Sequence, residues 1–394
     1  MGAGLAGKRC SGLPLTLIPT LRFGTAFGWP YIPGAVFFAE VIIMWAKIKV
    51  FDFGTIYDGQ KAHLYKVERK NISFCVTDYG CSITSLKVRN KDSSFTDVVL
   101  GFETLDGYAS NWGCFGAVIG RFANRINGAS FKNNNVTYKL TENVEGACLH
   151  GGFPAWSNLI WSGKKVVKKN ASGICFTRDF ADGEQGFPGN LHVEVEYLIN
   201  DDNQLTMTYR AHTDKITPLS ITNHSYFNLR GKEQVHDYVL KLDSDNIVTF
   251  SGKGALIPVS GTEYDFTKER PLCDNSEGAV KPGFMSYDVC YVSNAYDKDC
   301  GIPLAGKPVV KIAELTDPVS GRKMTVSTNQ EGFQLYTAKY VNHVAGKDGR
   351  WYVPYQAVCI ETQSFPDSPN QPDFPPVMLK PGQQYEARTV YEFN

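Results

Sequence analysis

Residues 191–211 read LHVEVEYLINDDNQLTMTYRA, and this stretch decides the fold. Leu191 to Ile199 and Gln204 to Ala211 alternate between apolar and polar side chains, which is the period of a half-buried β-strand. Asn200 to Asn203, between them, are all residues that favour turns. The stretch therefore predicts an antiparallel β-hairpin.

Short runs of the same kind recur after residue 50, separated by Gly, Asn and Asp. Helical periodicity over ten or more residues is hard to find there. No linker, internal repeat or change in composition divides this part of the chain. Residues 49–394 are therefore predicted to form one all-β domain, a large antiparallel β-sandwich. The further predicted strands are Ser73–Thr77, Ser82–Val88, Val136–Leu140, Tyr238–Leu242, Met324–Ser327, Phe333–Ala338 and Tyr385–Phe393.

Composition restricts the class of ligand. The 394 residues include 40 basic and 40 acidic side chains, so the formal net charge is zero. A surface for nucleic acid or an anionic membrane needs a basic face, and this even balance supplies none. Neither nucleic acid nor a membrane is therefore an expected partner. Aromatic residues make up 13% of the chain, which suits a flat, uncharged, hydroxyl-rich ligand.

The ten cysteines are scattered, without a CxxC pair or the Cys and His spacing of a zinc site. They are interpreted as buried thiols in a reducing compartment, and the expected localisation is cytoplasmic. The sequon Asn223-His224-Ser225 favours the same compartment, because a glycan on Asn223 would lie beside His224.

Residues 1–48 differ from the rest of the chain. The run from Gly24 to Trp45 is apolar and long enough to span a bilayer, but two prolines and Glu40 interrupt it. The preferred interpretation is a poorly ordered N-terminal extension, with Met44 as an alternative start. A membrane anchor and a signal peptide are the alternatives, the latter without a clear cleavage site.

A histidine and a glutamate are the candidates for acid–base chemistry. His224 lies among small and amide side chains in Ile221–Leu229, and the ordinary histidine pKa of about 6.5 suits proton transfer near neutrality. Glu361 follows the apolar run Ala357–Ile360, where burying an unpaired carboxylate is costly. We expect His224 to act as a general acid and Glu361 as a general base across a cleft. A structural histidine and a structural Glu–Arg pair are the alternatives.

Further polar residues stand beside glycines or apolar neighbours. In Gly116–Ile126, Arg125 can offer a planar fork of donors to adjacent hydroxyls, whereas Arg121 can equally make a structural ion pair. The glycines of this stretch lack the spacing of a phosphate-binding loop, so a nucleotide is not expected. His150 precedes two glycines and is either a ligand contact or part of an exposed turn. Asp288 either accepts ligand hydroxyls or binds backbone amides.

Together these stretches resemble the galactose mutarotase, or aldose 1-epimerase, family. The resemblance covers about residue 50 to the end and does not extend to residues 1–48. It implies a large β-sandwich of the galactose mutarotase-like type, a supersandwich, with no metal or organic cofactor. The matching motifs, in the order of the family, are FGAVIGRFANRIN at 115–127, LHGG at 149–152, TNHSYFNL at 222–229 and ETQSFPDSPN at 361–370.

The functional positions of the family fall on particular residues of this chain. The resemblance implies that His224 is the acid and Glu361 the base. Two segments depart from the family pattern and bear on sugar preference: Val289-Cys290-Tyr291 follows Asp288 where members often have His-Asn-Phe, and residues 153–158 replace a Gly-Phe-Asp-Lys type of segment. The implied sugar contacts are Asn124, Arg125, His150, Ser225, Tyr226, Asp288 and Gln334.

The implied activity is that of an isomerase of hexose metabolism, an aldose 1-epimerase that interconverts the α and β anomers of free hexoses such as galactose and glucose. The expected partner is a small-molecule aldose, and the chain is expected to be a monomer. One rival is an epimerase of a phosphorylated hexose, which needs basic groups beyond Arg121 and Arg125. The other is a non-catalytic carbohydrate-binding protein, which needs neither His224 nor Glu361.

Overall fold

The structure is a computed structural model that describes residues 47–110, 113–249, 254–295 and 301–394. The apolar run at 24–45 and the alternative start at Met44 lie outside the described residues. Strand β1 begins at Lys47, two residues before the start of the predicted domain. Within the described ranges, α1 (Leu105–Ala109) is the one α-helix, and no helix there has the length and apolar character needed to cross a membrane. Short 3-10 helices lie at Trp156–Asn158, Glu184–Gly186, Lys347–Gly349 and Ser368–Asn370.

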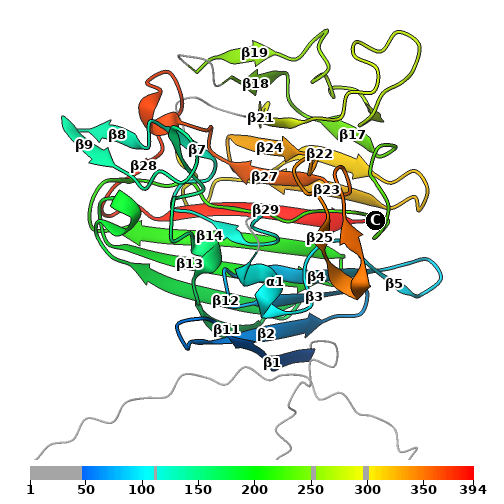
Figure 1. Ribbon diagram of the computed structural model, residues 1–394, viewed down its shortest axis with the longest axis horizontal. Coiled ribbons are helices and arrows are strands. Elements are labelled where there is room, and N and C mark those ends of the chain that lie inside the picture. The colour runs from blue at the N-terminus through cyan, green and yellow to red at the C-terminus, as the bar shows by residue number, and fades with distance from the viewer. Residues whose placement is uncertain (1–46, 111–112, 250–253, 296–300) are drawn as a thin grey trace, which may run out of the picture. The chain divides into compact units, whose positions relative to one another are not determined.

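The largest sheet has nine antiparallel strands in the order β11-β12-β13-β14-β29-β23-β22-β17-β20 (Figure 1). The predicted hairpin lies in this sheet, because β13 (Leu191–Asn200) pairs with β14 (Gln204–Thr213) in the register that places Ile199 opposite Leu205. The remaining strands are β11 (Ser162–Val167), β12 (Ala171–Phe180), β29 (Tyr385–Phe393), β23 (Lys323–Thr328), β22 (Val310–Thr316), β17 (Val239–Leu242) and β20 (Arg270–Pro271).

Two five-stranded antiparallel sheets accompany it, in the orders β1-β2-β3-β4-β5 and β19-β18-β21-β24-β27. The first consists of β1 (Lys47–Thr55), β2 (Lys61–Glu68), β3 (Ile72–Thr77), β4 (Ile83–Arg89) and β5 (Phe95–Asp97). The second consists of β18 (Asn246–Val248), β19 (Leu256–Pro258), β21 (Asp288–Val292), β24 (Gly332–Tyr336) and β27 (Cys359–Gln363).

Five two-stranded ribbons complete the described strands. The ribbon of β6 (Val118–Ile119) and β16 (Thr222–Asn223) matters most for function, because it leads directly into His224. The other ribbons pair β7 (Arg125–Asn127) with β10 (Ala147–Leu149), β8 (Ser130–Asn133) with β9 (Val136–Lys139), β15 (Thr217–Pro218) with β28 (Met378–Leu379), and β25 (Val344–Ala345) with β26 (Trp351–Tyr352).

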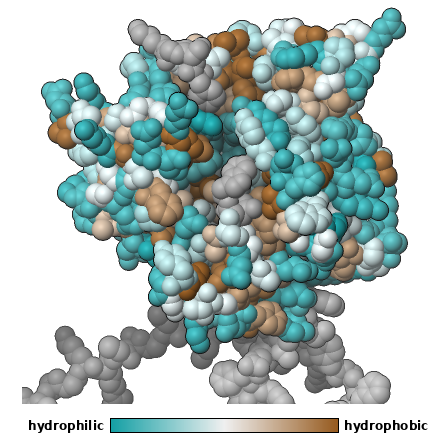
Figure 2. All heavy atoms as spheres, in the orientation of Figure 1, coloured by the Kyte–Doolittle hydropathy of each residue, from teal (hydrophilic) through white to brown (hydrophobic). Residues whose placement is uncertain are grey.

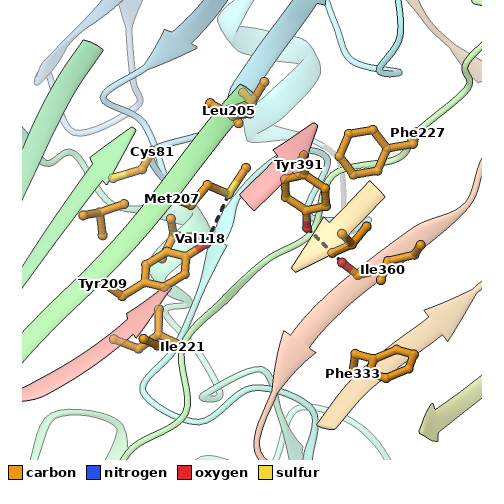
Figure 3. Packing of buried hydrophobic residues seen from close by; sticks show 14 of the residues in the cluster. Cys81, Val118, Leu205, Met207, Tyr209, Ile221, Phe227, Phe333, Ile360 and Tyr391 are labelled. Carbon is orange, nitrogen blue, oxygen red and sulfur yellow. Dashed lines mark hydrogen bonds between the residues drawn. The ribbon is translucent and has the colours of Figure 1, made fainter. Parts of the chain in front are cut away.

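Strict alternation builds the core between the sheets. Every second residue of β29, from Tyr385 to Phe393, is buried, as the period of a half-buried strand requires. Figure 3 shows Leu205, Met207 and Tyr209 of β14 in this core. Tyr391 of the adjacent strand β29 stands opposite Leu205, and its hydroxyl donates to the Ile360 carbonyl of β27 at 2.9 Å. This bond ties the second five-stranded sheet to the nine-stranded one.

The first five-stranded sheet packs on the nine-stranded sheet near its β11–β12 edge. The rings of Tyr65 in β2 and Phe176 in β12 meet edge to face with centroids 5.5 Å apart. Two smaller sheets therefore cover the nine-stranded sheet, and the predicted antiparallel β-sandwich is confirmed. Each further predicted strand overlaps an observed one, although Glu361 lies inside β27 rather than after a strand. Hydrophilic and hydrophobic residues are interspersed over the face drawn in Figure 2.

Candidate active site

A cavity of about 290 Å³ gathers most of the residues that the sequence singles out. Cavities of about 340 Å³ beside residues 261–281 and of about 440 Å³ beside Arg89 and Arg322 contain none of them. The predicted residues that line the 290 Å³ cavity are Asn124, Arg125, His150, His224, Tyr226, Asp288, Gln334 and Glu361.

The second five-stranded sheet supplies one wall of the cavity. Gln334 of β24 stands opposite Glu361 of β27, and Asp288 of β21 stands opposite Tyr336 of β24. Residues that face each other across antiparallel strands project to the same side of the sheet. This register therefore places carboxyl, amide and phenol groups from three strands on one surface.

His224 is held by its backbone at the end of β16. Its N–H donates to the Ala117 carbonyl at 2.9 Å, and its carbonyl accepts from the Gly116 N–H at 2.9 Å. The imidazole stacks on the Tyr226 ring with centroids 4.9 Å apart. The Tyr226 hydroxyl in turn donates to the Gly113 carbonyl at 2.8 Å, so the stacking ring is itself fixed.

The imidazole of His224 and the carboxyl group of Glu361 meet across the cavity wall. His224 Nε2 lies 3.6 Å from Glu361 Oε1. Only 7% of His224 and 2% of Glu361 is exposed. His224 Nδ1 and Glu361 Oε2 have no hydrogen-bond partner among the described residues. A buried histidine–glutamate pair therefore faces the cavity, and each side chain has an atom that can still form a hydrogen bond to a ligand.

Burial decides where the proton of this pair rests. It lowers the pKa of His224 to about 4. It also raises the pKa of Glu361 well above its ordinary range, and the negative charge of Asp288 adds to that rise. Both effects disfavour charge on buried groups, so burial favours a neutral imidazole beside a protonated carboxyl group.

A row of hydrogen bonds fixes the polar groups beside the pair. Asn124 Nδ2 donates to Gln334 Oε1 at 3.1 Å, and Gln334 Nε2 donates to Asp288 Oδ1 at 2.8 Å. Each amide is oriented by its neighbour, because only one choice of oxygen and nitrogen satisfies both bonds. Asp288 Oδ2 lies 3.9 Å from Lys339 Nζ, which brings a cation to the same side of the cavity.

The backbone around His150 determines which of its ring nitrogens faces a ligand. The Asn124 N–H donates to His150 Nδ1 at 3.2 Å, so Nδ1 is an acceptor and the neutral ring carries its hydrogen on Nε2. Burial, with the charges of His224 and Arg125, lowers the pKa of His150 well below its ordinary value and keeps the ring neutral. His150 Nε2 is therefore available as a hydrogen-bond donor to a ligand.

The two arginines of the Gly116–Ile126 stretch have different surroundings. The Arg125 guanidinium reaches the cavity and has no hydrogen bond or ion pair to any described residue. Arg121 is buried, and its Nη1 donates to the carbonyl oxygens of Pro188 and Gly189 at 2.8 and 3.1 Å. Arg125 is thus free to bind a ligand, and Arg121 is engaged in holding a neighbouring loop.

Ser225 is the one predicted sugar contact that the structure does not bring to the cavity. Its hydroxyl donates to Asn223 Oδ1 at 2.6 Å and does not line the cavity. The segment is extended, so His224 and Tyr226 project to one side and Ser225 to the other. Ser225 is therefore next to His224 in the sequence, but its side chain does not face the cavity.

Several lining residues escaped the sequence analysis. Tyr336 lies in the predicted strand Phe333–Ala338, two residues after Gln334, and this alternation was a usable signal. Tyr340 is 57% exposed and lies on a loop without a pattern. The other lining residues that were not predicted are Gly113, Cys114, Val144 and Leu149.

The fold is an antiparallel β-sandwich, and a buried histidine–glutamate pair faces its cavity. These features are typical of an enzyme that uses acid–base chemistry, and comparison with known proteins gives the family. The model of the family described as aldose 1-epimerase matches residues 63–392. The galactose mutarotase of Homo sapiens is 35% identical over 343 residues, which are 85% of this chain and 95% of that protein. The aldose 1-epimerase of Haemophilus influenzae is 30% identical over 348 residues, which are 86% and 97% of the two chains.

Solved structures agree with these relatives. An aldose epimerase homologue from C. elegans has a TM-score of 0.73 and 26% identity, covering 82% of this chain and 96% of that one. The galactose 1-epimerase of Lactobacillus acidophilus has the same fold, with a TM-score of 0.73 at 20% identity and coverage of 89% and 99%. The chain belongs to the aldose 1-epimerase family, whose members are isomerases that interconvert the anomers of aldoses.

Proposed function

We propose that this chain interconverts the α and β anomers of free hexoses, galactose and glucose among them, with Glu361 as base and His224 as acid. The observation that carries the proposal is the separation of 3.6 Å between His224 Nε2 and Glu361 Oε1 inside the cavity. The donor and acceptor are close enough to reach two neighbouring oxygens of one sugar, the C1 hydroxyl and the ring oxygen.

The ring opens by two proton transfers. Glu361 takes the proton of the C1 hydroxyl, the electron pair of that O–H bond forms the C1 carbonyl, and the bond from C1 to the ring oxygen breaks. His224 gives its proton to the ring oxygen, which becomes a hydroxyl. Rotation about the C1–C2 bond then presents the other face of the aldehyde, and the same groups close the ring in reverse roles. Each positioned group contributes on the order of 10²- to 10⁴-fold to the rate.

The mechanism needs a proton on His224 and a charged Glu361, whereas burial alone favours the proton on Glu361. Sugar hydroxyls supply hydrogen bonds to the charged groups and so replace part of the solvation that burial removed. Hydrogen bonds that strengthen as charge develops stabilise the transition state more than the ground state. Ligand binding therefore favours the charged arrangement of the pair from which the reaction begins.

The remaining polar groups orient the sugar. Arg125 offers two parallel donors to adjacent hydroxyls, and His150 Nε2–H offers a further donor. Asp288 and Gln334 present oxygens and an amide held by the row of hydrogen bonds described above. Arg125 and Lys339 are the cations near the described cavity, and Arg121 is engaged elsewhere, which favours a neutral sugar over a phosphorylated one.

We further propose that the chain acts as a monomer in the cytoplasm. The supporting observations are the zero net charge, the free thiols Cys148, Cys290 and Cys359, and the burial of the Asn223 amide, which donates to the Gly116 carbonyl at 2.7 Å and is closed to glycosylation. Light scattering of the full-length protein should give the mass of one chain, and fractionation of cells should place it in the soluble fraction.

Polarimetry of freshly dissolved α-D-galactose and α-D-glucose tests the activity. The full-length protein should accelerate the change in optical rotation, and Glu361→Gln should lose at least about 10²-fold in kcat. Glu331→Gln is the matched control, because Glu331 is an equally buried glutamate that lies outside the cavity and pairs with Lys307. It should retain kcat.

Other outcomes would assign another function. Sugar binding by titration without any acceleration would favour a carbohydrate-binding protein. Turnover of a hexose 6-phosphate but not of the free hexose would favour the epimerase of a phosphorylated sugar. If Glu361→Gln kept nearly full turnover, the assignment of the base would be wrong.

A further inference from the structure

A thiol stands next to the acid–base pair, and the proposed reaction does not use it. Cys359 precedes Glu361 by two residues on β27, so both side chains project from the same face of the strand. Cys359 is fully buried, in contact with the apolar cluster that contains Tyr226 and Tyr336. One donor atom each from Cys359, His224 and Glu361 lies within 4.8 Å of the other two.

These distances suit a tetrahedral metal ion. Zinc binds sulfur at about 2.3 Å, imidazole nitrogen at about 2.0–2.1 Å and carboxylate oxygen at about 2.0–2.2 Å. Two ligands at those lengths and at a tetrahedral angle are roughly 3.3–3.7 Å apart. The distance of 3.6 Å between His224 Nε2 and Glu361 Oε1 already matches, and the thiol sulfur lies within 4.8 Å of both donors.

We propose that Cys359, His224 and Glu361 bind a borderline-soft divalent cation, Zn²⁺ or Cd²⁺, in competition with the sugar. The donors are one sulfur, one nitrogen and one oxygen, a set that prefers these ions over Mg²⁺ or Ca²⁺. His224 and Glu361 line the cavity, so the fourth coordination position faces the ligand space. The ion would hold both catalytic groups and so inhibit the enzyme; it has no role in turnover.

The surroundings of the donors support this assignment. Glu361 Oε2 has no protein partner among the described residues, so a ligand atom can be recruited without breaking a hydrogen bond. The imidazole of His224 is neutral and presents a lone pair. Burial raises the pKa values of the Cys359 thiol and the Glu361 carboxyl group well above their ordinary values, so metal binding must release both protons to the solvent.

Titration of the full-length protein with Cd²⁺, in a phosphine reductant and without chelator, tests the site directly. Binding should produce the ultraviolet charge-transfer absorption of a cadmium–thiolate bond with a stoichiometry of one. Saturating galactose should weaken the apparent affinity, and Mg²⁺ in excess should produce no absorption and no inhibition. Inhibition of mutarotation by Zn²⁺ should be reversed by chelator.

Cys359→Ala isolates the thiol, because alanine keeps the cluster apolar. It should abolish the absorption band and raise the inhibitory concentration of Zn²⁺ at least about ten-fold relative to its own metal-free rate. Cys290→Ser is the matched control, since Cys290 is a buried thiol on strand β21, which β24 separates from β27, and it is not part of the three-residue group. Cys290→Ser should behave as the parent does.

Three outcomes would overturn the proposal: absence of the band in the parent, persistence of the band in Cys359→Ala, or a cadmium affinity that galactose does not change. If Cys359→Ala fails to fold, Glu361→Gln and the competition with galactose still decide the question. The metal site rests on the proposed function, but the experiments distinguish the failure of one from the failure of the other. A cadmium–thiolate band without mutarotation would sink the proposed function alone, whereas mutarotation without the band would sink the metal site alone.

Discussion

At the scale of single residues, Glu361 shows that function and stability oppose each other. Its carboxyl group is 2% exposed, one of its oxygens has no partner among the described residues, and burial raises its pKa. The folded state therefore holds the proton of Glu361 more tightly than the unfolded chain does. Raising the pH above the ordinary value of 4.5 removes that proton from the unfolded chain first, and this lowers the stability of the fold.

Glu361→Gln should therefore stabilise the protein while it abolishes activity. The gain in the free energy of unfolding should grow as the pH rises from about 5 to about 8, because only the parent has a buried carboxyl group whose proton becomes harder to keep. Urea unfolding of both proteins at the two pH values measures this. A gain that is equal at both pH values would mean that the pKa of Glu361 is ordinary.

His224 changes the free energy of unfolding with pH in the opposite direction to Glu361. Its folded-state pKa of about 4 lies below the ordinary value of 6.5. Between these values the unfolded chain binds the proton and the folded state does not, so acid destabilises the fold. His224→Gln should flatten the loss of stability between about pH 6.5 and pH 4 relative to the parent. Unfolding midpoints at several pH values in that range would show whether the slope changes.

Substitutions at Arg125 and Ser225 compare a side chain that lines the cavity with one that does not. Arg125→Ala removes donors that have no other described partner, and should raise KM by roughly ten- to a hundred-fold, since hydrogen bonds from a charged group are worth about 1.5–3 kcal/mol. Ser225→Ala loses a bond to Asn223 and should change KM by less than about two-fold. Steady-state polarimetry of both variants measures this. Equal increases in KM would place the Ser225 hydroxyl in contact with the sugar after all.

At the scale of elements, the loop that carries His150 is shaped by glycine. Gly151 has φ of 85°, and a Cβ there would lie 2.1 Å from the Gly120 carbonyl oxygen. The loop can approach residues 120–121 only without a side chain at this position. The same close approach keeps His150 near Asn124, whose N–H donates the hydrogen bond that orients the His150 ring.

Gly151→Ala should therefore displace His150 and lower kcat/KM by about ten- to a hundred-fold, because misplacing a positioning group by about 1 Å is enough for such a loss. Gly146→Ala is the control. Its φ of 69° is as unfavourable for alanine, but a Cβ there meets nothing within 4 Å. That variant should lose about 1–2 kcal/mol of stability and keep its kcat/KM.

At the scale of the whole molecule, the packing of two sheets determines the position of β27, the strand that carries Glu361. The Tyr391 hydroxyl of β29 donates to the Ile360 carbonyl, next to Glu361, whereas the Tyr209 hydroxyl of β14 donates to the sulfur of Met207 (Figure 3). The first bond joins the two sheets. The second lies within one strand and uses a weak acceptor.

Tyr391→Phe should therefore lower the free energy of unfolding by about 1–2 kcal/mol, because it leaves a buried carbonyl oxygen without that partner. Tyr209→Phe should change it by less than about 0.5 kcal/mol. Denaturant unfolding of the two variants gives the comparison. Equal losses would show that the bond between the sheets has no special weight.

The local pattern of the sequence was sufficient for the strands and for the chemical types in the site. Alternation predicted the β13–β14 hairpin and all of β29, because strands with one buried face show their period directly. The isolated, buried Glu361 and the motif around His224 indicated the acid–base pair. Local pattern did not reveal β12 or β22, and it did not show which side of the chain Ser225 faces.

What the sequence determined by itself is therefore the fold class, the family and the two groups proposed to exchange protons. Only the tertiary structure decided that His224 and Glu361 lie 3.6 Å apart, that Arg121 is engaged away from the cavity, that Cys359 stands beside the pair, and that burial raises the pKa of Glu361. The physical reason is that periodicity and motif are local properties of the chain. Distance, solvent exclusion and charge arise between residues far apart in the chain, and they exist only once the sheets have packed.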